Sequence, residues 1–391
     1  MADLNTAFLL LLPVAAASGW YAAHRSDKRS GKPTPSEFNT EYFKGLNYLL
    51  NEQQDKAIEV FLRMAEVDKD TVETHFALGN LFRRRGEVDR AIRIHQNLIA
   101  RENLTDEQRS QALLALAEDY MRAGLLDRAE DLFKEIVRSP GKHSRALGYL
   151  IDIYEQEKDW ISAIEATREL GNINGENYDS VMAQYFCELA EQTRERGDHS
   201  AVIRYLERAL DTDPNCVRAN LVFGHLYEEG GEYEKAIQSY KQVEQQDIEY
   251  TPEVINSLLS CYARLGKPYE VIPYLSELVD KSAGLSPMLA HADLVQRRDG
   301  DEAAELYITE QLRRRPSVRG LDKLIDVHLA YCAESARDNL MILRDLTQKL
   351  LENKPIYNCV KCGFKGRSLH WQCPGCKSWH TMKPVHGVEG E

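Results

Sequence analysis

Positive charge is scarce in this chain of 391 residues, which holds 49 Lys and Arg against 62 Asp and Glu and carries a net charge of −13. Residues 1–41 are balanced, and residues 354–391 are basic, with six Lys and Arg against two Asp and Glu. The acidic excess therefore lies in residues 42–353, whose net charge is −17. Because a nucleic-acid partner requires a basic face that contacts phosphates, this distribution predicts no nucleic-acid binding.

Catalytic motifs and a disulfide framework are lacking as well. The sequence contains no phosphate-binding loop, dinucleotide-binding glycine motif, nucleophile elbow or H-E-x-x-H. Disulfide frameworks are typical of short secreted chains, whereas four of the eight cysteines here are scattered singly, at positions 187, 216, 261 and 332. We expect these four to be small, mostly buried thiols in a reducing compartment, and we expect the protein not to be an enzyme.

One apolar run, residues 4–23 (LNTAFLLLLPVAAASGWYAA), carries no charge. As a helix it would span roughly 30 Å, the thickness of a bilayer core. Four basic residues follow it, whereas a cleaved signal peptide has its positive charges before the apolar run. The positive-inside rule then predicts a single-pass anchor over residues 1–23, a juxtamembrane linker over residues 24–40, and the bulk of the chain on the cytoplasmic side. A cleaved signal and a periplasmic scaffold remain the alternative.

Residues 41–353 repeat with a period near 34, the length of the tetratricopeptide helix–turn–helix. The pattern requires small residues at positions 8 and 20 and bulky ones at 11 and 24. In the first copy these are Gly45, Tyr48, Ala57 and Phe61. Eight copies lie in register, at steps of 34, 38, 34, 39, 34, 35 and 33 residues, and a degenerate ninth covers residues 321–350. Glycines at the turns favour left-handed helix ends. The sequence predicts an all-α, right-handed superhelix.

A superhelix of this kind has a concave surface that binds other polypeptides. Within NLFRRR, Asn80, Arg83 and Arg84 occupy positions 9, 12 and 13 of their repeat, which usually line the concave side. These three residues are candidates for gripping a carboxylate or a peptide backbone. The alternative is an ordinary solvated charged face.

Residues 354–391 contain two Cys-x-x-Cys pairs, Cys359 with Cys362 and Cys373 with Cys376. Two such turns place four thiolates around one tetrahedral ion, either zinc or a single iron. Because cysteines fill all four positions, the site is expected to be structural or redox-active rather than hydrolytic. The pattern resembles rubredoxin, which holds iron. Four aromatic residues are expected to form the small core of this knuckle: Tyr357, Phe364, Trp371 and Trp379.

The combination of anchor, repeats and rubredoxin-like knuckle resembles the lipopolysaccharide assembly protein B family of Gram-negative bacteria (LapB). The segments that carry the resemblance are LLLPVAAASGWY, LGNLFRRRGEVDRAIRIHQ, AGLLDRAEDLF and YNCVKCGF…HWQCPGC. The resemblance spans essentially the whole chain, and the family's metal cysteines correspond to Cys359, Cys362, Cys373 and Cys376.

The resemblance implies a regulatory adaptor in the inner membrane. Family members act with the membrane AAA+ protease FtsH to promote degradation of the deacetylase LpxC, which commits precursors to lipid A, and an anti-adaptor inner-membrane protein restrains them. Two other functions stay open, a redox or electron-transfer scaffold with iron and a general peptide-binding membrane scaffold. The sequence does not decide between a monomer and a homo-oligomer.

Overall fold

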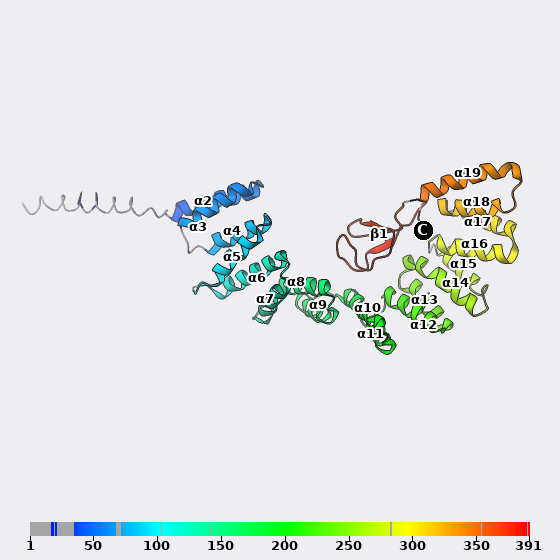
Figure 1. Cartoon of the computed structure of the whole chain (residues 1–391), viewed down its shortest axis with the longest axis horizontal. Helices are drawn as coiled ribbons and strands as arrows, with labels where there is room; N and C mark the ends of the chain where they lie inside the picture. The colour runs from blue at the N-terminus through cyan, green and yellow to red at the C-terminus, as the bar shows by residue number, and fades with distance from the viewer. Residues whose placement is uncertain are drawn as a thin grey trace, which may run out of the picture. The chain divides into compact units, whose positions relative to one another are not determined.

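The computed structural model describes residues 17–18, 20–21, 35–67, 72–102, 104–141, 143–281, 284–352, 354–388 and 390–391 (Figure 1). All but four positions of the predicted anchor lie outside the described residues, and so does most of the predicted linker. Among the helices that the structure describes, none combines the length and the apolar character that a membrane crossing requires.

The helices fall into two compact units, Met1–Ile153 and Tyr154–Glu391. The helices that begin in the first unit are α2 (Pro35–Leu50), α3 (Gln54–Val67), α4 (Val72–Arg84), α5 (Val88–Ile99), α6 (Asp106–Ala123), α7 (Leu126–Arg138) and α8 (Ser144–Glu157), of which α8 continues into the second unit. The first of them, α2, begins inside the range that the sequence assigned to the linker. Its start fits a proline, which has no N–H to leave unpaired in the first helical turn.

The second unit continues the same helical pairs. Its helices are α9 (Trp160–Asn174), α10 (Asp179–Glu195), α11 (His199–Thr212), α12 (Val217–Glu229), α13 (Tyr233–Gln246), the 3₁₀ helix η1 (Ile248–Tyr250), α14 (Pro252–Arg264), α15 (Ile272–Asp280), α16 (Ser286–Asp299), α17 (Asp301–Arg314), α18 (Val318–Leu329) and α19 (Glu334–Leu351). Within the described part of the chain, α2 to α19 make nine consecutive pairs. These pairs confirm the eight repeats and the degenerate ninth.

The close approach of the two helices in a pair confirms the predicted register. Gly224 at position 8 of its repeat lies against the ring of Tyr240 at position 24, and a Cβ there would be 2.2 Å from Cε1. Gly45 faces Phe61 in the same way, with a distance of 2.7 Å to Cζ. The small residue thus leaves the space that the large ring fills.

The predicted turn glycines also have the expected conformation. Gly124 ends α6 with φ 74°, and the N–H groups of Gly124 and Leu125 close the helix end. Lys158, at the same turn of a later repeat, has φ 58° although it has a side chain. The turn geometry therefore persists where the glycine signal is missing.

Beyond α19 the chain forms a small ribbon, residues 354–388, with a three-stranded antiparallel sheet in the order β2–β1–β3. The strands are β1 (Tyr357–Cys359), β2 (Lys365–Gly366) and β3 (Met382–Pro384). In Figure 1 the ribbon, marked by β1, lies beside the helices of the second unit, and η1 contacts β3 directly. The ribbon is therefore packed onto the repeats rather than tethered beyond them.

Candidate metal centre and its docking surface

Two turns with the same geometry present the four cysteines. In the first, the N–H of Cys359 donates to the carbonyl of Phe364 (2.7 Å), and the N–H of Gly363 donates to the carbonyl of Cys359 (2.9 Å). In the second, Cys373 and Lys377 make the corresponding bonds, both at 2.9 Å. The residue after each pair has a left-handed backbone conformation, with φ 75° at Gly363 and 57° at Lys377. Glycine adopts this conformation readily whereas lysine rarely does, so the sequence gives no sign of the left-handed residue in the second turn.

The four sulfur atoms converge on one point. All lie within 4.8 Å of one another, and the Sγ–Sγ distances are 3.8 Å for Cys359 with Cys376 and 3.7 Å for Cys362 with Cys373. A tetrahedral ion bound at about 2.3 Å requires sulfur–sulfur edges of about 3.8 Å. The donor set therefore fits one ion, and the geometry is common to zinc and iron.

The second turn comes close to the first through a glycine. A Cβ on Gly375 would lie 3.4 Å from Sγ of Cys362 and 3.3 Å from Cβ of Phe364. The lack of a side chain at this position lets the backbone of one turn approach the sulfur held by the other. This explains why the second pair contains glycine.

Hydrogen bonds favour the thiolate form of one cysteine, and crowding opposes it at another. Burial alone would raise the pKa of Cys359, but hydrogen bonds from Thr381 and from the backbone of residues 361 and 362 lower it to about 6. The backbone N–H of Phe364 favours the thiolate of Cys362, yet burial and the three neighbouring cysteines raise the pKa of Cys362 to about 12. Four thiolates this close repel one another, so a bound cation is required to keep all four deprotonated.

Two tryptophans expected in the knuckle core point onto the repeats instead, which corrects the sequence prediction. The ribbon's own cluster consists of Tyr357, Cys359, Cys373 and Met382, with Phe364, Leu369 and Cys376 against it. Trp371 packs against the core of the repeats, and Trp379 packs against Trp160 and Tyr185. The four cysteines fill so much of this short segment that little interior remains for large rings.

The carboxylate of Glu155, at the end of α8 in the second unit, holds one edge of the ribbon. It accepts hydrogen bonds from Nε1 of Trp379 (2.7 Å), Nε2 of Gln372 (2.8 Å) and the hydroxyl of Tyr185 (2.7 Å). The ring of Trp379 also packs edge-on to Trp160 and Tyr185, with centroids 6.0 and 5.7 Å away. Hydrogen bonds to a charged acceptor are stronger than those between neutral groups, so Glu155 fixes the position of this edge.

Tyr250 in η1 contacts a second edge of the ribbon. Its ring stacks on His380, with centroids 5.2 Å apart, and lies 5.6 Å from the ring of Trp371. Its hydroxyl donates to the carbonyl of Met382 (2.8 Å). Burial, with a contribution from nearby Lys383, lowers the pKa of His380, so the docked ribbon favours the neutral imidazole.

Opposite charges meet at this edge, where the basic end of the chain contacts its acidic middle. Nζ of Lys383 pairs with Asp247 and lies 3.4 Å from Glu249. The same ammonium lies 4.3 Å from the centre of the Tyr250 ring. Since Lys383 is mostly buried here, this pair is less screened by salt than a surface ion pair.

A third contact involves the segment that follows β3. The hydroxyl of Tyr357 donates to Glu253 (2.7 Å), and the carbonyl of Val388 accepts from the N–H of Val318 (2.8 Å). The carboxylate of Glu391 accepts two hydrogen bonds from Ser286, from its N–H and its hydroxyl, both at 2.8 Å. Tyr357 of β1 thus ties the ribbon to α14, and the segment after β3 ties it to α16 and α18.

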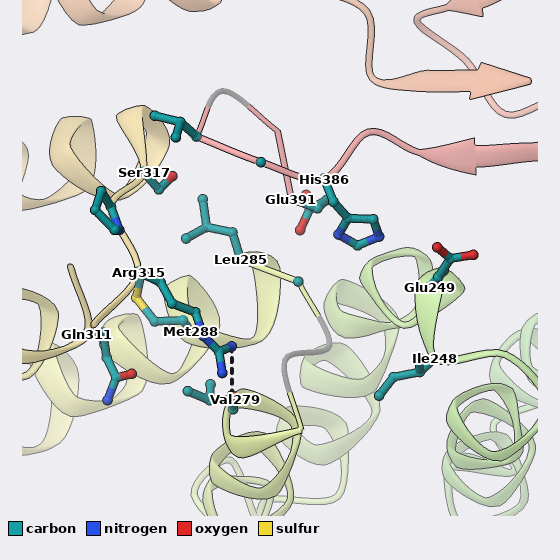
Figure 2. A pocket seen from close by; sticks show the side chains of 14 residues that line it. Ile248, Glu249, Val279, Leu285, Met288, Gln311, Arg315, Ser317, His386 and Glu391 are labelled. Carbon is teal, nitrogen blue, oxygen red and sulfur yellow. Dashed lines mark hydrogen bonds between the residues drawn. The ribbon is translucent and has the colours of Figure 1, made fainter. Parts of the chain in front are cut away.

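A cavity of about 510 Å³ lies behind this segment (Figure 2). Its lining is largely apolar, including Val279, Leu285 and Met288, with Arg315 on one wall and Glu391 on another. None of the four cysteines belongs to it. Sequence patterns gave no sign of this cavity, because its walls come from segments between residues 248 and 391 that only the fold brings together.

The predicted partner-binding residues lie in the first unit. Asn80, Arg83 and Arg84 all line one groove of about 580 Å³. The guanidinium of Arg83, however, is already paired with Asp119 (2.9 Å) and Glu118 (2.8 Å) and also binds Asn80 (2.6 Å). Arg84 is exposed. Binding of a partner by these residues stays a prediction, in which Arg84 is the cation best placed to meet a ligand.

Comparisons with known proteins cover the whole chain. A tetratricopeptide-repeat family model matches residues 78–315, and a rubredoxin metal-binding domain model matches residues 357–384. Lipopolysaccharide assembly protein B of Escherichia coli K12 is 42% identical over 382 residues, covering 97% of this chain and 98% of that protein. The Haemophilus influenzae protein of the same name is 33% identical, with the same coverage.

Among solved structures, the C-terminal part of a tetratricopeptide-repeat protein from Cytophaga hutchinsonii matches 66% of this chain and 99% of its own. Its identity is 13% and its TM-score is 0.43.

Proposed function

Because this chain belongs to the lipopolysaccharide assembly protein B family, we propose that it acts in lipopolysaccharide assembly as a non-enzymatic adaptor. The observation that carries the proposal is the docked ribbon. A site with four cysteine ligands leaves no ligand position for a substrate. The two tryptophans of the ribbon pack against the repeats. An array of helical repeats with a fixed metal-bound head is suited to holding other proteins together.

In its finer form, the proposal is that the chain promotes degradation of the deacetylase LpxC by the membrane protease FtsH and is itself restrained by an anti-adaptor membrane protein. Family resemblance is the basis for these partners. The groove that contains Arg84 supports a polypeptide partner, because it is open and lined by polar side chains and a few apolar ones.

We also propose an inner-membrane location, with residues 1–23 as a single-pass anchor and the repeats on the cytoplasmic side. The uncharged run and the basic residues that follow it support this topology. The division into a linker over residues 24–40, of which residues 35–40 belong to α2, repeats over residues 41–353 and a ribbon domain over residues 354–391 belongs to the same proposal.

The test is the lifetime of the deacetylase in cells that lack the native gene and carry a variant copy. Cys376→Ser should remove one metal ligand and lengthen the deacetylase half-life, and lipopolysaccharide should rise. Cys261→Ser, which changes a buried cysteine outside the ribbon, is the matched control and should behave as wild type. If the half-life in the Cys376→Ser strain equals that of wild type while the ribbon is unfolded, the adaptor proposal is wrong.

A second function, electron transfer or redox sensing, is favoured by one observation. Cys362 is exposed, whereas Cys359 and Cys373 are buried, so one sulfur could pass electrons to a partner. The purified chain loaded with iron and with zinc separates the two functions. Equal support of deacetylase degradation by both forms favours a structural metal, and activity of the iron form alone, lost on reduction, favours redox chemistry.

A further inference from the structure

Two thiols outside the metal centre lie in contact. Cys187 is in α10 and Cys216 is the residue before α12, and they are 29 positions apart in the sequence. Their sulfur atoms are 3.7 Å apart, and the two residues are 0% and 1% exposed. The sequence predicted small, mostly buried thiols that are scattered singly along the chain. The structure instead pairs them across the seam between two consecutive repeats.

Cys216 occupies a position that activates a thiol. It is the N-cap residue of α12, where the helix dipole favours a negative charge, although its thiol makes no capping hydrogen bond to the first N–H groups of the helix. The thiol of Cys187, the backbone N–H of Ala219 and the charge of Arg218 together lower the pKa of Cys216 although burial opposes this. Burial raises the pKa of Cys187. One thiol of the pair is therefore favoured as a thiolate and the other as a proton donor.

The surroundings contain buried polar atoms that make no hydrogen bond within the part of the chain that the structure describes. Gln184 and Arg218 are 1% and 2% exposed, and Nε2 of Gln184 lies 3.7 Å from Sγ of Cys216. Arg218 pairs with Glu188 and Glu191, both at 2.9 Å. Yet Oε1 of Gln184 and Nη1 of Arg218 have no hydrogen-bond partner among the described residues. A buried acceptor and a buried donor left unpaired are costly, and a small polar molecule at this place would satisfy them.

From this arrangement we propose that Cys216 and Cys187 form a peroxide-reactive dithiol that oxidises to a disulfide. The Cys216 thiolate attacks one oxygen of a hydroperoxide, the O–O bond breaks, and the leaving oxygen takes a proton and departs as water or alcohol. The resulting sulfenic acid is attacked by the sulfur of Cys187. The S–O bond breaks, an S–S bond forms, and a second water leaves with the Cys187 proton. A cellular dithiol reductant returns the pair to two thiols.

Formation of the disulfide requires little movement of the two sulfur atoms. Its structural effect would extend to the surface on which the ribbon docks. The sulfurs must approach from 3.7 Å to about 2.05 Å. The bond would tie α10 to α12, and Arg218, two residues from Cys216, lies 5.7 Å from the ring of Trp371 in the ribbon. Oxidation would therefore change the surface on which the ribbon docks.

Cys261 provides an internal control for access. It is also 0% exposed, so an oxidant must enter through a local opening of the repeats to reach either site. Burial raises the pKa of Cys261 to about 11, and no second thiol contacts it among the residues that the structure describes. A difference in reactivity between Cys261 and Cys216 then reports on the paired environment rather than on burial.

The experiment exposes the full chain, with its metal bound, to a few equivalents of hydrogen peroxide, followed by alkylation, trypsin and mass spectrometry. Trypsin releases Cys187 and Cys216 in separate peptides, residues 169–194 and 209–218, so the disulfide appears as a cross-linked peptide pair. We expect this cross-link to form while Cys261 stays reduced and before metal is released. Dithiothreitol should reverse it.

Two variants identify the attacking thiol. Cys216→Ser should leave Cys187 unreactive, whereas Cys187→Ser should let a sulfenic acid accumulate at Cys216, where dimedone traps it. The wild-type cross-link is itself a readout that needs no variant to fold. The proposal is overturned if Cys261 oxidises as fast as Cys216, or if the ribbon cysteines oxidise while Cys187 and Cys216 remain thiols.

Discussion

At the scale of single residues, the repeats depend on places where a side chain is missing. Gly224 has no room for a Cβ, because the ring of Tyr240 lies 2.2 Å from where it would be. Gly148, also inside a helix, has no atom within 4 Å of its would-be Cβ. The same substitution at these two positions should therefore have opposite effects.

We expect Gly224→Ala to lower the free energy of unfolding by about 1–3 kcal/mol, because the aromatic ring must shift. Gly148→Ala should raise it by about 0.5–1 kcal/mol, since alanine restricts the unfolded chain. Urea unfolding followed by circular dichroism measures both. A stabilised Gly224→Ala variant would show that the assigned helix pairing is wrong.

Neighbouring arginines in the first unit have different roles. Arg83 neutralises Asp119, which is fully buried, and Glu118. Arg83→Ala should destabilise the first unit by about 3 kcal/mol, the lower end for a broken buried pair, because Asp119 keeps only His95 as a partner and Glu118 keeps only the mostly exposed Arg145. Arg84→Ala, the matched control for stability, should stay within about 0.5 kcal/mol of wild type.

The same two variants test partner binding. If the groove binds a polypeptide, Arg84→Ala should weaken capture of that partner while thermal unfolding stays unchanged. Full binding by Arg84→Ala would remove this residue from the partner surface.

His380 makes docking of the ribbon depend on pH. Its pKa is lowered in the docked state by burial and by Lys383, against the opposing effect of Asp247 and Asp213. Stability from docking is therefore present above the free histidine pKa, near 6.5, and is lost as pH falls below it, because the undocked state takes up a proton that the docked state does not.

We expect tryptophan emission of the metal-loaded chain to shift to longer wavelength between pH 7.5 and 5.5, as Trp371 and Trp379 become exposed. His380→Phe keeps a ring to stack on Tyr250 and has no proton to gain, so its emission should be constant over this range. Metal content is measured at each pH, and an equal shift in the variant would assign the effect to another group.

At the scale of elements, the ribbon is a short segment built around four clustered cysteines, and its two tryptophans lie outside its own core. Its tryptophans are packed between the ribbon and the repeats, so docking and folding of this segment support each other. At the edge of the ribbon that contains Trp379, the repeats contribute one carboxylate, that of Glu155, which accepts three hydrogen bonds.

Glu155→Ala should undock this edge, because three hydrogen bonds to a charged group are lost at once and the indole N–H loses its acceptor. We expect faster proteolysis near residue 353 and a cost of about 2–3 kcal/mol. Glu165→Ala, an exposed glutamate on the next helix, should be cleaved at the wild-type rate. Equal protection in both variants would mean that the other contacts suffice.

At the scale of the whole molecule, the metal stabilises more than its own ligands. The ribbon covers Tyr250 and contacts Tyr185, both almost fully buried in the second unit. Without the ion the four thiolates repel and the ribbon loses its fold, and the repeats beneath it lose apolar contacts while their helices remain.

Chelation should therefore release one ion per chain, unfold the ribbon and shift tryptophan emission, with little change in helical circular dichroism. Thermal unfolding of the second unit should begin at a lower temperature, by several degrees, as expected when a bound ligand is removed. Adding zinc back should restore both signals. Helix loss that matches the emission change would instead indicate that the repeats require the metal to fold.

The sequence by itself determined the helical pairs, their register and the four cysteines. These signals are local or periodic. A small residue at position 8 and a bulky one at position 24 recur because the two helices of every repeat pack in the same way. Each Cys-x-x-Cys turn is defined by a few consecutive residues and does not depend on the rest of the chain. The fold and the clustered cysteines are therefore predictable from the sequence alone.

The tertiary structure alone decided where the ribbon packs and which side chains serve it. The outward position of Trp371 and Trp379, the three donors on Glu155 and the contact between Cys187 and Cys216 join residues 29 to 224 positions apart. No periodic signal links such residues, because each contact is made once and depends on how successive repeats stack. The stacking of the repeats decides which residue a buried side chain contacts. The sequence pattern indicates only that the side chain is apolar.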